Sequence, residues 1–222
     1  MLAGTGWQGG GVLAAFFVSS SLISRGAPSP CGLDPKGERR DHRQVLANGG
    51  IAAAAALTGF HNGPLGLWLV TASLAAAAAD TWATALGARS AATPRLILGG
   101  RAVPPGTSGG ITPLGTLGGA AGALLVATVG ALASGISTLL PMGALVGFGG
   151  MALDSALGAA AQGRFRCPRC AEFSEWPRHR CGATTVHEGG LPWLDNDGVN
   201  LASSAAAALA AGAAWRWLCP CS

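Results

Sequence analysis

Two aspartates interrupt long apolar segments of the sequence. Asp80 lies in the segment 64–87 and Asp154 in the segment 136–162, seven and eight residues before the ends of those segments. In helices, this places both at a depth of about 10 Å from the same membrane face. Ionisable groups inside membrane segments are costly and usually functional. Carboxylates suit Mg²⁺, so the pair predicts a cation site, although a proton or cation pathway would use similar residues.

Polar residues at the starts of two further segments are expected at the same level. The segment 44–60 begins with Gln44 and Asn48, which stack at i, i+4, and the segment 198–218 follows the run LDNDGVN. In that run Asp197, Asn200 and Ser204 share one helix face. The alternative is that the aspartates only hydrogen-bond or cap neighbouring helices. The candidate catalytic residues are Asp80, Asp154, Asp197, Asn48 and Asn200, with the three aspartates as the Mg²⁺ ligands.

A glycine-rich segment, RAVPPGTSGGITPLG, precedes the expected helix 111–134. Glycines permit close backbone approach, and N–H groups at a helix N-terminus attract anions. It lacks the Gly-Lys-Ser/Thr ending of a Walker A loop, and a re-entrant turn is the alternative. Arg39, Arg40 and Arg43 either neutralise further phosphate charge or anchor the orientation. The candidate nucleotide-binding residues are Gly106, Thr107, Ser108, Gly109, Gly110 and Arg43.

A third group of residues has the types and spacing of metal ligands. Cys167 and Cys170 form a C-x₂-C pair, and His179 and Cys181 follow as H-x-C. Cys and His in such pairs bind Zn²⁺ tetrahedrally. Because the protein would fill all four positions, the candidate zinc would be structural. The H-x-C half is tighter than the usual spacings.

The composition indicates whether the chain is soluble or lies in a membrane. Only 11% of the 222 residues are charged and half are hydrophobic, whereas a soluble domain has about 25% charged residues. Such a chain has too few charges for a soluble surface and is too apolar for intrinsic disorder. The sequence therefore predicts an integral membrane protein.

Apolar segments predict an all-α, polytopic membrane protein with about six transmembrane helices and three longer cytoplasmic loops. We expect one membrane domain over 1–218, with a cytoplasmic Cys/His loop, 163–195, inserted between the last two helices. Glycines at small-xxx-small spacing indicate close helix packing, Pro64 marks a helix start and Pro141 a kink. The expected helices are 9–24, 44–60, 64–87, 111–134, 136–162 and 198–218.

Basic residues predict the orientation. Thirteen of the 14 Lys and Arg residues lie in the loops 25–43, 88–110 and 163–197, which alternate with turns that have none. The positive-inside rule places these loops in the cytoplasm and both termini outside, in the cell inner or plasma membrane. Anionic lipid headgroups explain the basic charge, and no nucleic-acid partner is expected. The first helix lacks the basic region of a signal peptide, so we do not expect it to be one.

Six motifs, in order, resemble one family of integral-membrane proteins that includes plant phytyl-phosphate kinase and eukaryotic transmembrane protein 19. They span roughly residues 13–205 and read RRDHRQVLANGG, AADTWATALG, VPPGTSGGITPLGTLGG, ALDSALGAAAQ, HRCG and LPWLDNDGVN. The resemblance implies phosphorylation of an isoprenoid monophosphate to its diphosphate by a nucleoside triphosphate, with CTP as the expected donor. The motif residues are Gln44, Asn48, Asp80, Thr81, Gly106 to Gly110, Asp154, Ser155 and Asp195 to Asn200.

The sequence departs from the family pattern at Ala85, where members often have Glu, and it lacks a leading hydrophobic segment that many members have. If that Glu helps to bind metal, this chain binds the metal differently. The expected partners are membrane lipid, the isoprenoid phosphate and the nucleotide, with Mg²⁺ as cofactor. The alternatives are a CTP-dependent lipid-phosphate cytidylyltransferase, a cation-coupled transporter using Asp80 and Asp154, and a membrane scaffold.

Overall fold

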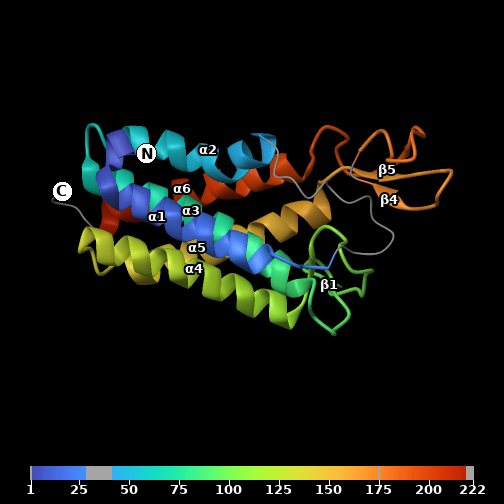
Figure 1. Cartoon of the computed structure of the whole chain (residues 1–222), viewed down its shortest axis with the longest axis horizontal. Coiled ribbons are helices and arrows are strands. Elements are labelled where there is room, and N and C mark those ends of the chain that lie inside the picture. Colours follow the sequence, from blue (N-terminus) through green and yellow to red (C-terminus); the bar gives the residue numbers. More distant parts are fainter. Residues whose placement is uncertain (1, 29–41, 175, 219–222) are drawn as a thin grey trace.

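A computed structural model describes residues 2–28, 42–174 and 176–218, in which six helices form one elongated bundle (Figure 1). The first helix starts and the last helix ends at one end of the bundle, and the short strands lie at the other. The expected six helices and all-α class are confirmed. The helices are α1 Leu2–Ser24, α2 His42–Thr58, α3 Gly63–Gly87, α4 Pro113–Ser134, α5 Leu139–Ala160 and α6 Asn196–Leu218.

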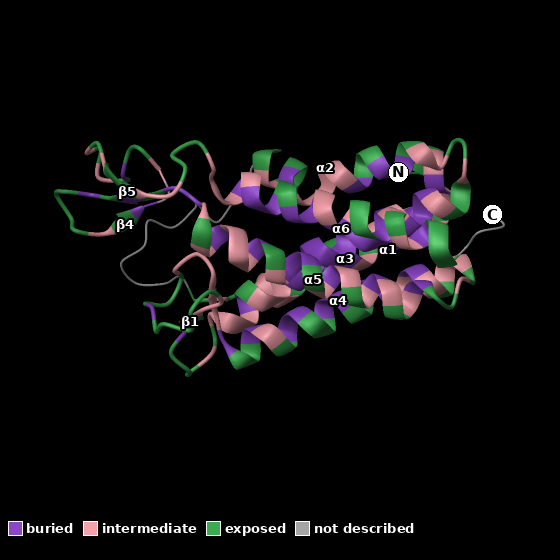
Figure 2. Ribbon diagram, turned by 180° about the vertical axis from the view of Figure 1, so that it is seen from behind, coloured by how far each residue is buried: buried purple, intermediate pink, exposed green. Residues whose placement is uncertain are grey.

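Helix α3 is the centre of the bundle and packs against each of the other five helices. Figure 2 shows its buried surface enclosed by the surrounding helices. Small residues make this possible, because α3 contains an alanine run, 75–79, that is fully or almost fully buried. A Cβ added at Gly147 of α5 would lie 2.7 Å from Ala75 Cβ, and one at Gly118 of α4 would lie 2.6 Å from Leu86 Cδ1. The small-xxx-small glycines are therefore packing glycines.

Local signals explain the helix starts. Asn62 caps α3 by accepting a hydrogen bond from Leu65 N at 2.9 Å, and Pro64 lies in the first turn, as expected. The kink expected at Pro141 is wrong. Since α5 begins at Leu139, Pro141 lies in its first turn, where a missing N–H costs little. The first helix also begins earlier than expected, at Leu2, with a non-helical break at Gly6.

Three helices, α3, α4 and α5, are long and apolar enough to cross a membrane. Helix α2, with 17 residues, is shorter than the roughly 20 residues that a bilayer requires. Length and composition therefore support three of the six expected spans among the described residues.

Short strands, which the sequence did not predict, order the loops at one end of the bundle. Strands β1, Arg95–Leu96, and β2, Gly110–Ile111, pair antiparallel. Strands β3 Arg164–Arg166, β4 Phe173–Ser174 and β5 Val186–Gly189 form an antiparallel sheet in the order β4-β3-β5. These two sheets bring the loops after α3 and α5 to the same end of the molecule (Figure 1).

Candidate functional site

The two membrane-embedded aspartates meet at one side chain of α6. In the orientation that satisfies both atoms of its amide, Asn200 Nδ2 donates to Asp154 Oδ2 at 2.8 Å and to Asp80 Oδ2 at 3.3 Å. Asp154 and Asn200 are buried, at 7% and 6% exposed, and Asp80 is half-buried. The expected convergence of α3, α5 and α6 at one level is thus present, and it places two carboxylates on one donor group.

Two further residues of α6 complete this cluster: Asn196, which belongs to the motif Asp195 to Asn200, and Ser203, which lies outside the predicted motifs. Ser203 Oγ donates to Asp154 Oδ2 at 2.9 Å, and Asn196 Nδ2 donates to Asn200 Oδ1 at 3.0 Å. Ser203 lies three residues after Asn200 and Asn196 four before it. The i, i+3 spacing from Asn200 indicates that Ser203 lies on the same helix face, although spacing alone does not show what that face contacts.

A cavity of about 690 Å³ opens beside this cluster. Its volume lies within the range of about 300–1,000 Å³ for small-molecule sites. Its walls combine polar groups with apolar ones, which include Phe16, Ala27, Pro28 and Met151. The polar lining residues include Gln44, Asn48, Asp80, Asp154, Gln162, Asn196 and Asn200, together with the whole segment 105–112.

A smaller cavity of about 270 Å³ is lined by residues of α1, α3 and the α4–α5 turn, including Gln8, Pro64 and Ile136. No ionisable side chain is among its described lining residues. We therefore place the candidate site in the larger cavity.

The glycine-rich loop packs against the part of α5 that directly follows Asp154. A Cβ added at Gly109 would lie 2.5 Å from both Ser155 O and Ala159 Cβ, and Gly109 has φ +75°. Thr107 N and its hydroxyl both donate to Pro104 O, while Gly110 N donates to Thr107 O at 2.9 Å. Only glycine combines this left-handed backbone with this close approach. The loop is thereby held beside the acidic cluster.

The loop does not open a helix directly, contrary to the expectation from the sequence. Strand β2 intervenes, and Thr112 caps α4 by accepting from Gly115 N at 3.0 Å. Among the described residues, the backbone N–H groups of Ser108 and Gly109 donate to no other backbone group. Any anion binding by this loop therefore depends on the N–H groups of the loop itself, because the first turn of α4 is capped.

Helix α2 contributes an oxygen to the cavity. Asn48 lines it and donates its own Nδ2 to Gln44 O at 3.0 Å. Its Oδ1 is buried and accepts no hydrogen bond within the part of the chain that the structure describes. A buried amide oxygen costs free energy unless it is paired. It is therefore suited to a cation or to a ligand that donates a hydrogen bond.

Two expected site residues lie outside the cavity lining. Asp197 is 5% exposed in the first turn of α6, where its neighbour Asn196 lines the cavity instead. Arg43 forms an ion pair with Asp195, with Arg43 Nη2 3.4 Å from Asp195 Oδ2. The roles of Asp197 and Arg43 stay predictions, and Arg39 and Arg40 lie outside the described residues.

No Lys or Arg is among the described residues that line the cavity. The nearby Arg89 donates instead to Ala85 O at 2.7 Å and to Arg25 O at 2.8 Å. Among the described lining residues, the groups that can donate to an anionic ligand are therefore backbone N–H, hydroxyl and amide groups.

The four candidate zinc ligands form a second cluster, outside the bundle. The ligand atoms of Cys167, Cys170, His179 and Cys181 lie within 4.8 Å of one another. A hydrogen bond with His179 is the main cause that lowers the pKa of Cys181 to about 6, whereas hydrogen bonding to Cys181 chiefly raises that of Cys170 to about 11. The cluster lies in the β3–β5 segment, and Ser174 and Trp176 of that segment line the large cavity.

Comparisons with known proteins agree with a membrane protein. A family model described as "Integral membrane protein DUF92" matches residues 1–208. An uncharacterized membrane protein of Methanocaldococcus jannaschii is 38% identical over 56% of this chain and 52% of its own length. "Protein PGR" of Arabidopsis thaliana is 35% identical over 50% of this chain and 46% of its own length. The chain thus spans about half the length of these curated relatives, and no solved structure matches it.

Proposed function

The chain belongs to this DUF92 family of integral membrane proteins, and from that premise we propose that it is a membrane kinase for lipid phosphates. The proposed reaction converts an isoprenoid monophosphate to its diphosphate with a nucleoside triphosphate, CTP, as donor. One observation carries the proposal. The same cavity is lined by two carboxylates, which share the Asn200 amide, and by a glycine-rich loop, in which the N–H groups of Ser108 and Gly109 donate to no other backbone group of the described chain.

The residues present fit Mg²⁺. Asp80 and Asp154 supply carboxylate oxygens, and Asn48 Oδ1 is an amide oxygen without a donor in the described chain. Two carboxylates on one donor group repel each other when both are ionised, and a divalent cation relieves that repulsion. When bound, Mg²⁺ would neutralise part of the charge of the phosphates, which is its usual role in phosphoryl transfer.

The chain's own residues would position the reactants. The N–H groups of Ser108 and Gly109 would bind phosphate oxygens. An oxygen of the acceptor phosphate would attack the γ-phosphorus, the bond from that phosphorus to the β–γ bridging oxygen would break, and nucleoside diphosphate would leave. The acceptor phosphate is already ionised, so no strong general base is required. The apolar wall with Phe16 and Met151 would accommodate the first isoprene units of the acceptor.

The direct test is incubation of the purified protein with each γ-labelled nucleoside triphosphate, Mg²⁺ and a panel of prenyl monophosphates. We expect prenyl diphosphate and nucleoside diphosphate in equal amounts, as identified by mass spectrometry. Chelation with EDTA should reduce the rate at least a hundredfold, and excess Mg²⁺ without other metals should restore it.

Three other results would contradict the kinase proposal. Release of pyrophosphate with a CMP-linked lipid would indicate the cytidylyltransferase. Aspartate-dependent ion flux in vesicles without nucleotide consumption would indicate the transporter. No turnover with any nucleotide and prenyl phosphate, in protein that is folded and loaded with Mg²⁺, would contradict both the kinase and the cytidylyltransferase.

We further propose that the strand-bearing end of the bundle faces the cytoplasm of a cell inner or plasma membrane, because the basic loops after α3 and α5 lie there. The exposed Arg178 and Arg180 provide a test. Trypsin added to intact cells without an outer membrane should leave this loop uncut, and trypsin added to inverted membrane vesicles should cut it. Cleavage in intact cells would reverse the orientation.

A further inference from the structure

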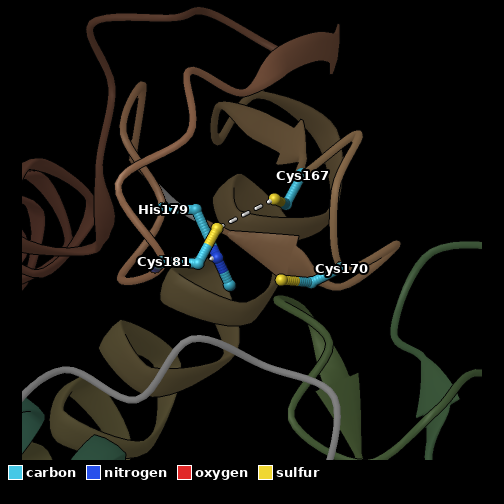
Figure 3. Close-up of side chains that lie close together, drawn as sticks. All are labelled: Cys167, Cys170, His179 and Cys181. Atoms are coloured by element: carbon cyan, nitrogen blue, oxygen red, sulfur yellow. Dashed lines mark hydrogen bonds between the residues drawn. The ribbon is translucent and has the colours of Figure 1, made fainter.

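The Cys/His cluster lies in a loop segment that the proposed phosphoryl transfer does not use. Cys167 and His179 are buried, at 0% and 2% exposed, although the segment projects from the end of the bundle. Figure 3 shows the side chains of Cys167, Cys170, His179 and Cys181 gathered in one place between two loops. Cys167 Sγ lies 3.6 Å from Cys181 Sγ. Two sulfurs bound to one tetrahedral Zn²⁺ at 2.3 Å would lie about 3.8 Å apart.

Two similar turns, the second one residue shorter than the first, present the four ligands. In the first, Cys167 N donates to Glu172 O and Ala171 N donates to Cys167 O, both at 2.9 Å. In the second, His179 N donates to Ala183 O at 3.0 Å and Gly182 N donates to His179 O at 2.8 Å. In each turn, the residue directly after the second ligand has a left-handed backbone.

One of those left-handed residues is unfavourable by itself. Gly182 has φ +83°, which glycine adopts freely, but Ala171 has φ +55° and is the single non-glycine residue with positive φ in the described chain. An alanine in this conformation is strained, and such strain persists only where its surroundings hold it. Bonds from Cys167 and Cys170 to one metal ion would hold the turn closed.

The histidine is oriented as a ligand by a neighbouring carboxylate. His179 Nε2 lies 3.1 Å from Glu172 Oε2, and Arg180 Nη2 donates to the same oxygen at 2.9 Å. Cys181 N donates to His179 Nδ1 at 3.3 Å, so Nδ1 is the acceptor nitrogen and Nε2 carries the proton. A zinc ion would take this lone pair from Cys181 N–H, whose contact of 3.3 Å is long for a hydrogen bond. A carboxylate on the far nitrogen is the common arrangement for zinc-binding histidines.

We propose that Cys167, Cys170, His179 and Cys181 bind one structural Zn²⁺ ion, which fixes the segment between them as a wall of the large cavity. Ser174 and Trp176, which lie between the two turns, line that cavity together with Asp80 and Asp154. The site is closed because four protein ligands fill a tetrahedral shell. It has no position for a substrate, and its existence does not depend on the reaction that the cavity performs.

The test measures metal in the purified full-length protein, prepared with reductant, by inductively coupled plasma mass spectrometry. We expect about one zinc per chain, and less than a tenth of that in the variants Cys170→Ser and His179→Gln. The matched controls Cys31→Ser and His187→Gln should keep the wild-type content, since His187 Nε2 lies outside the cluster and pairs with Gly190 O at 3.1 Å. The variant His179→Cys should also keep zinc, because it retains four ligands.

A second measurement tests whether zinc fixes the segment between the two turns, which forms the cavity wall. Removal of zinc by a chelator should accelerate tryptic cleavage after the exposed Arg169 and Arg178 at least tenfold, and zinc should restore protection. Less than a tenth of a zinc per chain in wild-type protein would overturn the proposal, whether the four residues are free or Cys167 and Cys181 are oxidised to a disulfide. Stoichiometric iron, or zinc content unchanged in Cys170→Ser, would overturn it as well.

Discussion

The variant Asp154→Asn is expected to lose at least about 10³-fold in the rate of phosphoryl transfer while it stays folded. Asp154 shares the Asn200 amide with Asp80, so the substitution removes one of the two charges that would attract the cation. An asparagine oxygen can still accept the hydrogen bond that Ser203 Oγ donates. Because the substitution also removes a repulsion between like charges, the melting temperature without metal should not fall. The measurements are turnover and thermal unfolding in detergent.

Metal binding separates this interpretation from a loss of fold. Mg²⁺ should raise the melting temperature of the wild type, since a ligand that binds only the native state stabilises it, and should leave that of Asp154→Asn unchanged. Asp80→Asn should behave in the same way. The matched control Glu188→Gln, which removes an exposed carboxylate paired with Arg166, should retain full activity. Full activity in Asp154→Asn or Asp80→Asn would refute the metal site.

The variant Gly109→Ala is expected to weaken nucleotide binding at least tenfold. Its Cβ would lie 2.5 Å from Ser155 O, a backbone atom of a packed helix, so the loop would have to move away from α5. Forcing a methyl group into such a contact costs about 1–3 kcal/mol, and 1.4 kcal/mol corresponds to a tenfold change in affinity. Equilibrium dialysis with a non-hydrolysable nucleotide analogue measures the dissociation constant.

Gly99 provides a control for the strain of the backbone alone. It has φ +84°, close to that of Gly109, but a Cβ at Gly99 would meet no atom within 4 Å. Gly99→Ala should therefore destabilise the fold by about 1–2 kcal/mol and change nucleotide affinity less than twofold. Equal losses of affinity in the two variants would show that the position of the loop against α5 is not what binds the nucleotide.

The helices and the membrane class were predictable because their signals are local. Long apolar segments are recognised along a single helix, and Pro64 marks a helix start within one turn of the chain. Pro141 was misread because a proline signals either a kink or a first turn, and only the observed start of α5 at Leu139 decides between them. The short strands were missed for the opposite reason. Strand β1, for example, has two residues, too few for a periodic pattern.

The sequence was sufficient to predict the depth of the candidate site in the bundle. Only the contacts between its residues required the structure. Helical spacing placed Asp80, Asp154 and Asn200 near one another, because polar groups at equal depth in neighbouring helices have few other places to lie. Helical spacing could not decide which polar residue of α6 faces the cavity. The rotation of α6 against α3 and α5 directs Asn200 and Asn196 into the cavity and Asp197 away from its lining.

By itself, the sequence determined that the chain is a membrane protein with six helices. It also determined which loops are basic and which residue types are available for chemistry. These follow from composition and from spacing along single helices. Tertiary structure alone decided that two aspartates share one amide, that Gly109 is seated on α5 and that the cysteine loop supplies a wall of the cavity. The physical reason is that each of these contacts joins segments far apart in the sequence. Their distances depend on how helices rotate and pack, which no local pattern records.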